Sequence, residues 1–486
     1  MVLKKLNRWL YLVHRWFGVV MCVFIALWFA TGIIMMYVEY PELTEVERLQ
    51  QLEPIAFDRI EVDVGAAAAS LHAGDAFSSI KLAQVLGRPA YQFAGKNPPL
   101  RTVFADTGEE LHGLQPEQAL LAARHSGFSS EGIAASYQGL LAVDQWTVSS
   151  ELHASRPLHK VAMNDDAGTV VYVSNVSGQI VRDSNRRERM WNWFGSTIHW
   201  IYPYQLRQHQ TVWANLLIYL SLAGVIVVLT GGIVGFIRLR VMKPYHGSSV
   251  TPYRGIRQWH HLLGLGCLLF VSTFMFSGLM SMSPWGLFDN ATAAGEQVDR
   301  YTGGPLSALD QFPSPATIGN DGTVKEVEWQ RIGTTPLLVL SRSATDKQVL
   351  ANSGLLRSIA LRRLIDGALA SLQPDARLLT STALDDYDNY YYSHHNRYRP
   401  LPALRVQFDD AERSWYTIDL NTGSVVMRQT ATDRVARWLY NGMHSLDFAL
   451  VFQHRPLWDV LVILLCIIGF GFALTSVVLG WRRLTY

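Results

Sequence analysis

Apolar residues are concentrated in four long runs along the chain. The runs lie at about 13–37, 212–237, 259–282 and 457–480. Each reaches the roughly 20 apolar residues that a helix needs to cross the hydrocarbon core of a bilayer. The pattern therefore predicts four transmembrane helices, which separate two long polar segments, at about 38–211 and 283–456, from short segments on the other side.

The two long segments contain short stretches typical of the strands and helices of small α+β domains. Alternating apolar and polar residues predict strands at 170–174 and 179–182 in the first segment and at 405–408 and 415–420 in the second. A helix is expected at Pro116–Arg124. Because the same signals appear in both segments, we expect two modules of similar fold.

Basic residues flank the apolar runs on one side only. They are Lys4, Lys5 and Arg8 before the first run, Arg238, Arg240, Lys243, Arg254 and Arg257 between the second and third, and Arg482 and Arg483 at the end of the fourth. Cytoplasmic loops carry an excess of Lys and Arg. The sequence therefore predicts cytoplasmic termini and two long segments on the far side of the membrane.

Composition agrees with a membrane protein. The chain has 486 residues, of which 49% are hydrophobic and 17% charged, whereas soluble proteins are about 25% charged. A net charge of +2 gives no reason to expect a nucleic-acid partner. The first apolar run is too long for a signal peptide, so we interpret it as an anchor.

The sequence of the first half recurs in the second. His14, Gly18 and Gly32 recur 246 residues later as His260, Gly264 and Gly278. Eight further residues recur after 245 residues: Trp193, His199, His209, Trp213, Gly224, Thr230, Gly235 and Arg238, as Trp438, His444, His454, Trp458, Gly469, Thr475, Gly480 and Arg483. We interpret the chain as an internal duplication with a pseudo-twofold axis.

An ionisable residue in a membrane segment is a candidate functional residue, and neutral imidazole is a common ligand of haem iron. His14 and His260 begin the first and third apolar runs, so a twofold axis would let them share one iron near the cytoplasmic face. Gly18 and Gly264 lie on the same helix faces and leave room for a flat macrocycle. His261 is the alternative to His260.

A second site is expected near the outer face. His199 and His444 precede the second and fourth runs, each after an amphipathic stretch. His209 and His454 form a rival pair ten residues later. Either pair could instead belong to an interfacial belt with neighbouring tryptophans.

Other motifs limit the cofactor and the donor. Arg8 and Arg254 correspond across the repeat and are either propionate contacts or topology-setting charges. The absence of C-x-x-C-H predicts non-covalent haem b. No nucleotide-binding motif is present, so electrons would come from a quinol or a separate cytoplasmic reductase. The three cysteines all fall inside apolar runs, where they cannot cross-link the outer segments.

Several motifs together make the chain resemble the PepSY-associated transmembrane proteins of bacterial inner membranes. They are His14-Arg15-Trp16-Phe17-Gly18, Thr31-Gly32, Thr107-Gly108, Thr422-Gly423, Met443-His444-Ser445-Leu446-Asp447-Phe448, Arg455-Pro456-Leu457-Trp458-Asp459 and Gly480-Trp481-Arg482-Arg483. Each motif alone is loose, but their order covers nearly the whole chain. Some members of this family resemble ferric-siderophore reductases with two haems. The resemblance favours His199 and His444 over His209 and His454.

The expected architecture is a membrane α-helical protein with four transmembrane helices, pseudo-twofold duplication and two periplasmic α+β PepSY-like domains. Its expected parts are 1–37 (N-terminus and first transmembrane helix), 38–188 (first periplasmic domain), 189–240 (interfacial helix and second transmembrane helix), 241–258 (cytoplasmic loop), 259–283 (third transmembrane helix), 284–433 (second periplasmic domain) and 434–486 (interfacial helix, fourth transmembrane helix and C-terminus).

The expected function is electron transfer across the bacterial inner membrane by two haems b per chain. The family resemblance implies a ferric-siderophore as the periplasmic acceptor. One alternative is a non-enzymatic periplasmic ligand-binding or regulatory protein, whose histidines bind nothing. A second is a siderophore or metal permease, although four spans with few polar residues offer a poor polar path.

Overall fold

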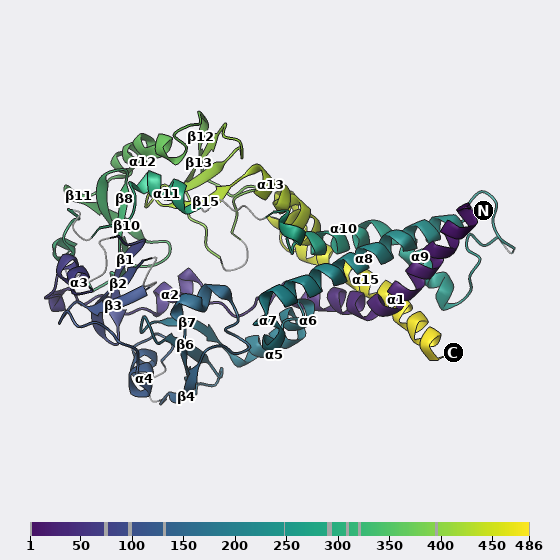
Figure 1. Ribbon diagram of the computed structural model, residues 1–486, viewed down its shortest axis with the longest axis horizontal. Coiled ribbons are helices and arrows are strands. Elements are labelled where there is room, and N and C mark those ends of the chain that lie inside the picture. The colour runs from purple at the N-terminus through teal and green to yellow at the C-terminus, as the bar shows by residue number, and fades with distance from the viewer. Residues whose placement is uncertain are drawn as a thin grey trace. The chain divides into compact units, whose positions relative to one another are not determined.

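The computed structural model describes residues 2–71, 76–95, 100–129, 133–246, 248–288, 294–307, 311–318, 322–393 and 397–485. The chain divides into two compact units (Figure 1). The helical unit comprises Met1–Tyr40, Met190–Asp289 and Asp433–Tyr486, and the sheet unit comprises Pro41–Arg189 and Asn290–Thr432.

Long apolar helices build the helical unit. They are α1 (Val2–Met35), α8 (Gln210–Arg238), α15 (Leu457–Thr485) and the pair α9 (Ile256–Gly266) and α10 (Leu268–Met280). In the described part of the chain, three helices are long and apolar enough to cross a membrane, or four if the bent pair is one span. All four predicted spans fall on these helices.

The third span differs from the straight helix that its apolar pattern predicts. Its two halves, α9 and α10, are bent by 70° around Cys267. Gly264 and Gly266 directly precede the break. Glycine is a poor helix former, because it loses more backbone conformational freedom in a helix than other residues do. The two halves differ in pattern, because α9 is amphipathic whereas α10 is apolar throughout, and the prediction of one continuous run overlooks this difference.

The helices pack in matched pairs. Helix α1 packs along α15 and α8, while α10 packs on α8 and α9 on α15 (Figure 1). Phe29, Phe274 and Val271 lie at the centre of this packing, together with Cys267 and Cys466. Cys22, Cys267 and Cys466 are all buried and free, so none cross-links the sheet unit, as the sequence predicts.

Short helices lead into α8 and α15. They are α5 (Arg186–Phe194), α6 (Ser196–His199) and α7 (Tyr204–Arg207) before α8, and α13 (Ala431–Arg437), the π-helical turn η5 (Trp438–Gly442) and α14 (Ala449–Phe452) before α15. Gly195 separates α5 from α6, and a Cβ there would lie 3.0 Å from Ile34 of α1. This close approach holds α6 against α1.

A seven-stranded antiparallel sheet forms the centre of the sheet unit, in the order β11-β10-β9-β8-β1-β2-β3. Its strands are β1 (Ser79–Val85), β2 (Arg88–Ala94), β3 (Leu100–Phe104), β8 (Glu326–Ile332), β9 (Thr335–Ser341), β10 (Lys347–Ala351) and β11 (Gly354–Leu355). Strand β1 pairs with β8, so that Ile80 lies opposite Trp329. The two long segments, expected as separate domains, therefore share one sheet, in which each segment covers the open edge of the other.

Two four-stranded sheets complete the unit, ordered β4-β5-β6-β7 and β12-β13-β14-β15. Their strands are β4 (Ser136–Leu141), β5 (Leu158–Ala162), β6 (Val170–Ser174), β7 (Ile180–Ser184), β12 (Leu378–Leu384), β13 (Ala403–Phe408), β14 (Trp415–Asp419) and β15 (Val425–Gln429). The helices of this unit include α2 (Glu45–Gln51), α3 (Val64–Ser70), α4 (Pro116–Arg124), α11 (Ala294–Thr302) and α12 (Ser358–Leu372). The helix predicted at Pro116–Arg124 and the four predicted strands are confirmed.

A buried ion pair connects the two segments of the sheet unit. Glu326 of β8 is 3% exposed. It accepts two hydrogen bonds from Arg48, at 2.7 and 3.0 Å, and one from Lys81 of β1 at 3.3 Å. Burial acts to raise the pKa of Glu326, but the charges of Lys81 and Arg48 and their hydrogen bonds lower it to about 2. The carboxylate therefore stays ionised at the centre of the shared sheet.

Glu326→Gln is expected to lower the stability of the sheet unit by about 3 kcal/mol, because it removes one partner of a buried pair. Arg48 and Lys81 keep weaker contacts to Glu45 and Glu328. Thermal unfolding at neutral pH measures the difference. Glu328→Gln, in the next but one position of the same strand and 40% exposed, is the matched control and should change stability little.

The loss should depend on pH. A carboxyl group whose pKa is lowered by folding stabilises the folded state above its unfolded pKa of about 4.3. That contribution disappears as the pH falls through about 2. The difference between wild type and Glu326→Gln should therefore shrink below about pH 4; a difference that stays constant down to pH 2 contradicts the assigned ion pair.

Candidate functional site

Two histidines that the sequence places on different helices face each other near one end of the helical unit. His14 of α1 and His260 of α9 have ring centroids 6.3 Å apart, with their planes inclined by 36°. Both rings are half-buried. For this pairing, the side of α1 that carries His14 must lie against the side of α9 that carries His260. The repeated His-x-x-x-Gly spacing predicts that these sides are equivalent.

A second pair faces each other at the other end of α1. His199 ends α6 and His444 follows η5; their ring centroids are 6.2 Å apart and their planes are inclined by 78°. Matched tryptophans hold the two segments, because Trp213 Nε1 donates to the carbonyl of Trp200 and Trp458 Nε1 to that of Ser445, each at 2.9 Å.

The length of α1 sets the distance between the two pairs, and glycines lie beside the rings of the outer one. Gly32 of α1 lies beside His199, where a Cβ would be 3.9 Å from its Cε1 atom, and Gly278 of α10 lies beside His444 at 3.6 Å. Gly32 is eighteen residues beyond His14 on the same helix, which corresponds to about 27 Å at a rise of about 1.5 Å per residue. The pairs are thus separated by nearly the thickness of a bilayer core.

Hydroxyl groups set the protonation of the outer pair, His199 and His444. Thr31 Oγ1 lies 2.9 Å from His199 Nδ1 and donates its own proton to the carbonyl of Leu27. Ser277 Oγ does the same for His444, at 3.0 Å from Nδ1, and donates to the carbonyl of Phe274. Since each hydroxyl proton is already used, the hydroxyl accepts and Nδ1 carries the hydrogen. The lone pair of each neutral imidazole is then on Nε2.

Hydrogen bonds also orient the inner pair, His14 and His260. His14 Nδ1 lies 3.1 Å from the carbonyl oxygen of Val227, which can only accept. His260 Nδ1 lies 3.2 Å from Thr475 Oγ1, whose proton goes to the carbonyl of Phe472, and 3.3 Å from Ser476 Oγ. His14 therefore carries hydrogen on Nδ1 and keeps Nε2 as an electron-pair donor, and the contact with Thr475 favours the same tautomer for His260.

The spacing of each pair suits one metal ion with four other ligands. Two nitrogens that each lie about 2 Å from one ion are about 4 Å apart, and the radius of an imidazole ring adds about 1 Å on each side. Two rings on opposite sides of an ion thus have centroids about 6 Å apart, which agrees with 6.3 and 6.2 Å. A haem supplies four equatorial nitrogens and leaves two axial positions, so the residues present fit this group.

His261, the alternative to His260, has both ring nitrogens engaged. Its Nδ1 lies 2.7 Å from Thr251 Oγ1 and its Nε2 lies 2.9 Å from the carbonyl oxygen of Gly235. The carbonyl requires a hydrogen on Nε2, so this atom cannot act as a ligand. The structure brings His260 to His14 and uses His261 to join α9 to α8.

The remaining predicted site residues lie apart from the pairs. His209 and His454 are exposed at the starts of α8 and α15, and Arg8 and Arg254 are exposed as well. A Cβ at Gly264 would lie 3.0 Å from Phe472, whose ring stacks on His260 at 5.3 Å. In contrast, Gly18 has open space within 4 Å among the described residues.

Sequence reasoning missed the hydrogen-bonding residues and one close contact. Thr31 and Ser277 occupy equivalent positions, each directly before a repeated glycine, so comparing the repeats for hydroxyl side chains would have found them. Gly231 of α8 packs against His14: a Cβ there would lie 2.6 Å from its Cε1.

Comparison with known families extends over almost the whole chain. The sequence model of the PepSY-associated TM region matches residues 11–484, a range that contains both histidine pairs. The chain belongs to this family. It is a multi-pass membrane protein with a sheet-rich unit, in agreement with the predicted class. The comparison with curated proteins returned no match.

The tautomer of His199 gives a direct test of the site. Thr31→Val should release His199 Nδ1 and allow hydrogen on either nitrogen, at a cost in stability of about 1 kcal/mol for the lost hydrogen bond. Nitrogen NMR of ¹⁵N-histidine-labelled, metal-free protein distinguishes the two forms. Thr273→Val is the control, because among the described residues Thr273 Oγ1 bonds only the carbonyl of Phe270. An unchanged His199 signal in Thr31→Val contradicts the assignment.

Proposed function

We propose that this chain is a b-type haem protein of the bacterial inner membrane that carries electrons to a periplasmic acceptor. The supporting observation is that four imidazole rings face each other in two pairs, with ring centroids 6.3 Å apart in one pair and 6.2 Å apart in the other. The Nδ1 atom of each ring is hydrogen-bonded to the protein. Two haems per chain would be held by His14 with His260 and by His199 with His444.

The protein contributes orientation and a dry environment. When bound, haem iron supplies one-electron redox chemistry between Fe(III) and Fe(II). Two histidines would hold each haem iron, which would favour electron transfer over oxygen chemistry. The hydrogen bond at each Nδ1 orients the ring and increases the basicity of Nε2. Buried apolar residues between the pairs, among them Phe29 and Phe274, exclude water from the path.

The direction of transfer follows from charge and position. Basic residues before α1 and between α8 and α9 favour a cytoplasmic location for these ends. His14 and His260 would then be near the cytoplasm, and His199 and His444 near the periplasm. The sequence contains no nucleotide-binding motif, so a quinol or a separate cytoplasmic reductase is the proposed donor.

A ferric-siderophore is the proposed acceptor, on the strength of the family resemblance. One electron converts the chelated Fe(III) to Fe(II). Hard oxygen ligands bind the doubly charged ion less strongly than the triply charged one, so the reduced iron would leave the chelator. The step consumes one electron per iron and needs no covalent change in the siderophore.

Matched contacts support the proposed internal duplication. Helix α1 packs on α15 as α10 packs on α8, and α6 packs on α1 as η5 packs on α10. The two histidine pairs lie where equivalent segments of the halves meet. A duplicated protein obtains both halves of each site from one ancestral set of residues, which explains why the ligands recur at a spacing of 245 or 246 residues.

Haem content tests the proposal directly. Reduced-minus-oxidised spectra with haem measured per chain should give two haems in the wild type and one in either His14→Ala or His444→Ala. His454→Ala is the matched control and should keep two haems, since this exposed histidine bonds only the carbonyl of Leu450 in the part of the chain that the structure describes. Colourless wild-type protein, or loss of haem from His454→Ala alone, contradicts the assignment.

Gly231→Ala should remove the inner haem without removing a ligand. The added Cβ would lie 2.6 Å from His14 Cε1 and must displace the ring; overpacking of this kind costs about 1–3 kcal/mol. Gly471→Ala of α15, with open space around it, should keep both haems. Equal haem content in the two variants would show that the position of His14 is unimportant.

The acceptor is tested with reduced protein in proteoliposomes under anaerobic conditions. Adding a ferric hydroxamate chelate should reoxidise the haems and release two Fe(II) per chain, measured with a ferrous-specific chelating dye. His444→Ala should fail to reduce the chelate. Haems that stay reduced in the presence of excess ferric chelates would exclude this acceptor class while leaving the haem assignment intact.

A further inference from the structure

One end of the helical unit carries charge of a single sign. The start of α1, the segment between α8 and α9, and the end of α15 lie together there (Figure 1). We call this the basic end, because its exposed charged side chains among the described residues are Lys5, Arg8, Arg15, Arg238, Arg240, Lys243, Arg254, Arg257, Arg482 and Arg483. The sequence has no Asp or Glu in 1–38, 190–288 and 460–486. The basic end therefore has no acidic side chain of its own.

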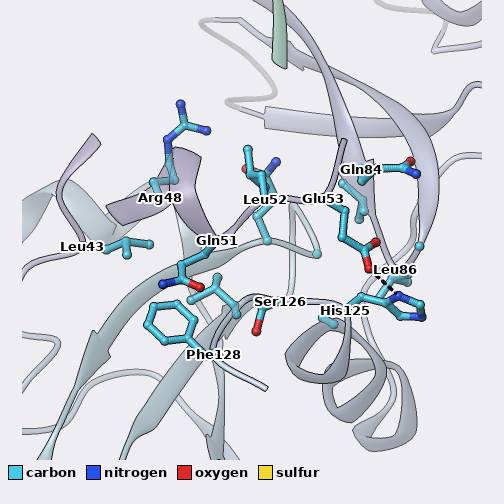
Figure 2. Close-up of a pocket in the computed structure, with 16 residues that line it drawn as sticks. Leu43, Arg48, Gln51, Leu52, Glu53, Gln84, Leu86, His125, Ser126 and Phe128 are labelled. Carbon is cyan, nitrogen blue, oxygen red and sulfur yellow. Dashed lines mark hydrogen bonds and ion pairs between the residues drawn. The ribbon is translucent and has the colours of Figure 1, made fainter. Parts of the chain in front are cut away.

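The sheet unit differs, because acidic and basic side chains lie side by side in it. Glu53 Oε1 accepts a hydrogen bond from His125 Nδ1 at 3.0 Å beside a small pocket (Figure 2). Arg88 Nη2 donates to Asp106 Oδ1 at 2.6 Å. Opposite charges at such distances largely cancel each other's field in the surrounding water. At the basic end the positive field is not cancelled in this way and extends about 8 Å into solution at physiological salt.

The basic segment between α8 and α9 is folded. The Arg240 N–H donates to the carbonyl of Val250 at 2.9 Å, and the Tyr245 N–H donates to the carbonyl of Ser249 at 2.8 Å. The Tyr245 hydroxyl donates to the carbonyl of Arg238 at 3.1 Å, and the guanidinium carbon of Arg240 lies 4.5 Å from the centre of the Tyr245 ring. Charges that only set topology need no fixed arrangement. Fixed positions favour a surface that a partner recognises.

The basic end lies close to the inner histidine pair. Tyr11 precedes His14 by three residues on α1, which corresponds to about 5 Å along the helix axis. Its hydroxyl accepts a hydrogen bond from Arg238 Nε at 2.6 Å. Thr251 Oγ1, at the other end of the folded segment, lies 2.7 Å from Nδ1 of His261, the residue after the second histidine of the pair. A molecule bound at the basic end would thus approach the pair without entering the apolar core.

We propose that the basic end is the docking surface of an acidic soluble protein that carries single electrons. The proposal rests on the proposed haem function and selects the protein donor over the quinol. The reduced carrier would lose one electron and the inner haem iron would gain it, passing from Fe(III) to Fe(II), with no bond made or broken. A quinol would also release two protons, and the basic end has no carboxylate to accept them. Opposite net charges speed association and orient the partner in weak redox complexes with small interfaces.

Docking is measured on the full chain in phosphatidylcholine nanodiscs by biolayer interferometry, with an acidic flavodoxin as the probe. The association rate should fall about tenfold or more between about 20 and about 200 mM salt, because salt screens the attraction. Charge reversal in the double variant Arg240→Glu with Lys243→Glu should lower it about tenfold at low salt. Arg363→Glu, at an exposed position of α12, is the control and should bind as the wild type does. Cytochrome c, a basic carrier, should not bind.

Electron transfer separates the donor from the haem assignment. Anaerobic flavodoxin hydroquinone should reduce the wild-type haems about ten times faster than those of the double variant, whereas dithionite should reduce both proteins to the same extent and so show that the variant is folded. Absence of haem contradicts the proposed function, whereas haem that only dithionite or a quinol analogue reduces contradicts the docking proposal alone. Equal flavodoxin binding by the wild type and the double variant also overturns it. So does enrichment of phosphatidylglycerol around the wild type without flavodoxin binding, which would assign the basic end to lipid.

Discussion

The hydrogen bond at Nδ1 of each paired histidine is the interaction on which the account of this protein depends. An imidazole in an apolar helix bundle can rotate and can carry its hydrogen on either nitrogen. Thr31, Ser277 and the carbonyl of Val227 remove both freedoms for three of the rings, and Thr475 and Ser476 hold the Nδ1 side of His260. All four rings are thus oriented by the protein. Without these bonds each ring could rotate, and the proposed haem sites would not be preformed.

Helix packing places these donors. Short residues let helices approach where the rings lie: Gly32 beside His199, Gly278 beside His444 and Gly231 beside His14. The length of α1 separates the two pairs by about the thickness of an apolar core. The sheet unit is built on a different principle, because a seven-stranded sheet and the buried Glu326 join its two segments. Each unit is thus assembled from both halves of the sequence.

Much of this arrangement can be predicted from the sequence because matching residues recur at a nearly constant spacing in the two halves. Equal spacing of His14 and His260 from their glycines indicates equivalent helix faces, and these faces do meet. The repeat spacing favours His260 over His261 but does not exclude His261. That choice depends on Thr251 and the carbonyl of Gly235, which satisfy His261 through contacts between distant segments. The periodicity of a sequence shows which residues share one face of a helix, but not which other segment that face contacts.

Two features of the fold were beyond prediction for a similar reason. The 70° bend at Cys267 falls between an amphipathic half, α9, and a uniformly apolar half, α10, and the apolar content of the run as a whole hides this change. The pairing of β1 with β8 joins strands that are about half the chain apart, and alternation along each strand shows only that one face is buried. Local patterns therefore predict the individual helices and strands. They do not predict which strand edges pair, and the two long segments are connected by such a pairing, between β1 and β8.

Electron paramagnetic resonance of the oxidised protein tests the central claim most directly. Low-spin ferric haem with two histidine ligands gives a signal whose anisotropy increases with the angle between the imidazole planes. The planes are inclined by 36° in one pair and by 78° in the other. The account predicts two low-spin signals per chain, one rhombic and one highly anisotropic. A high-spin ferric signal, or a spectrum without haem iron, would contradict it.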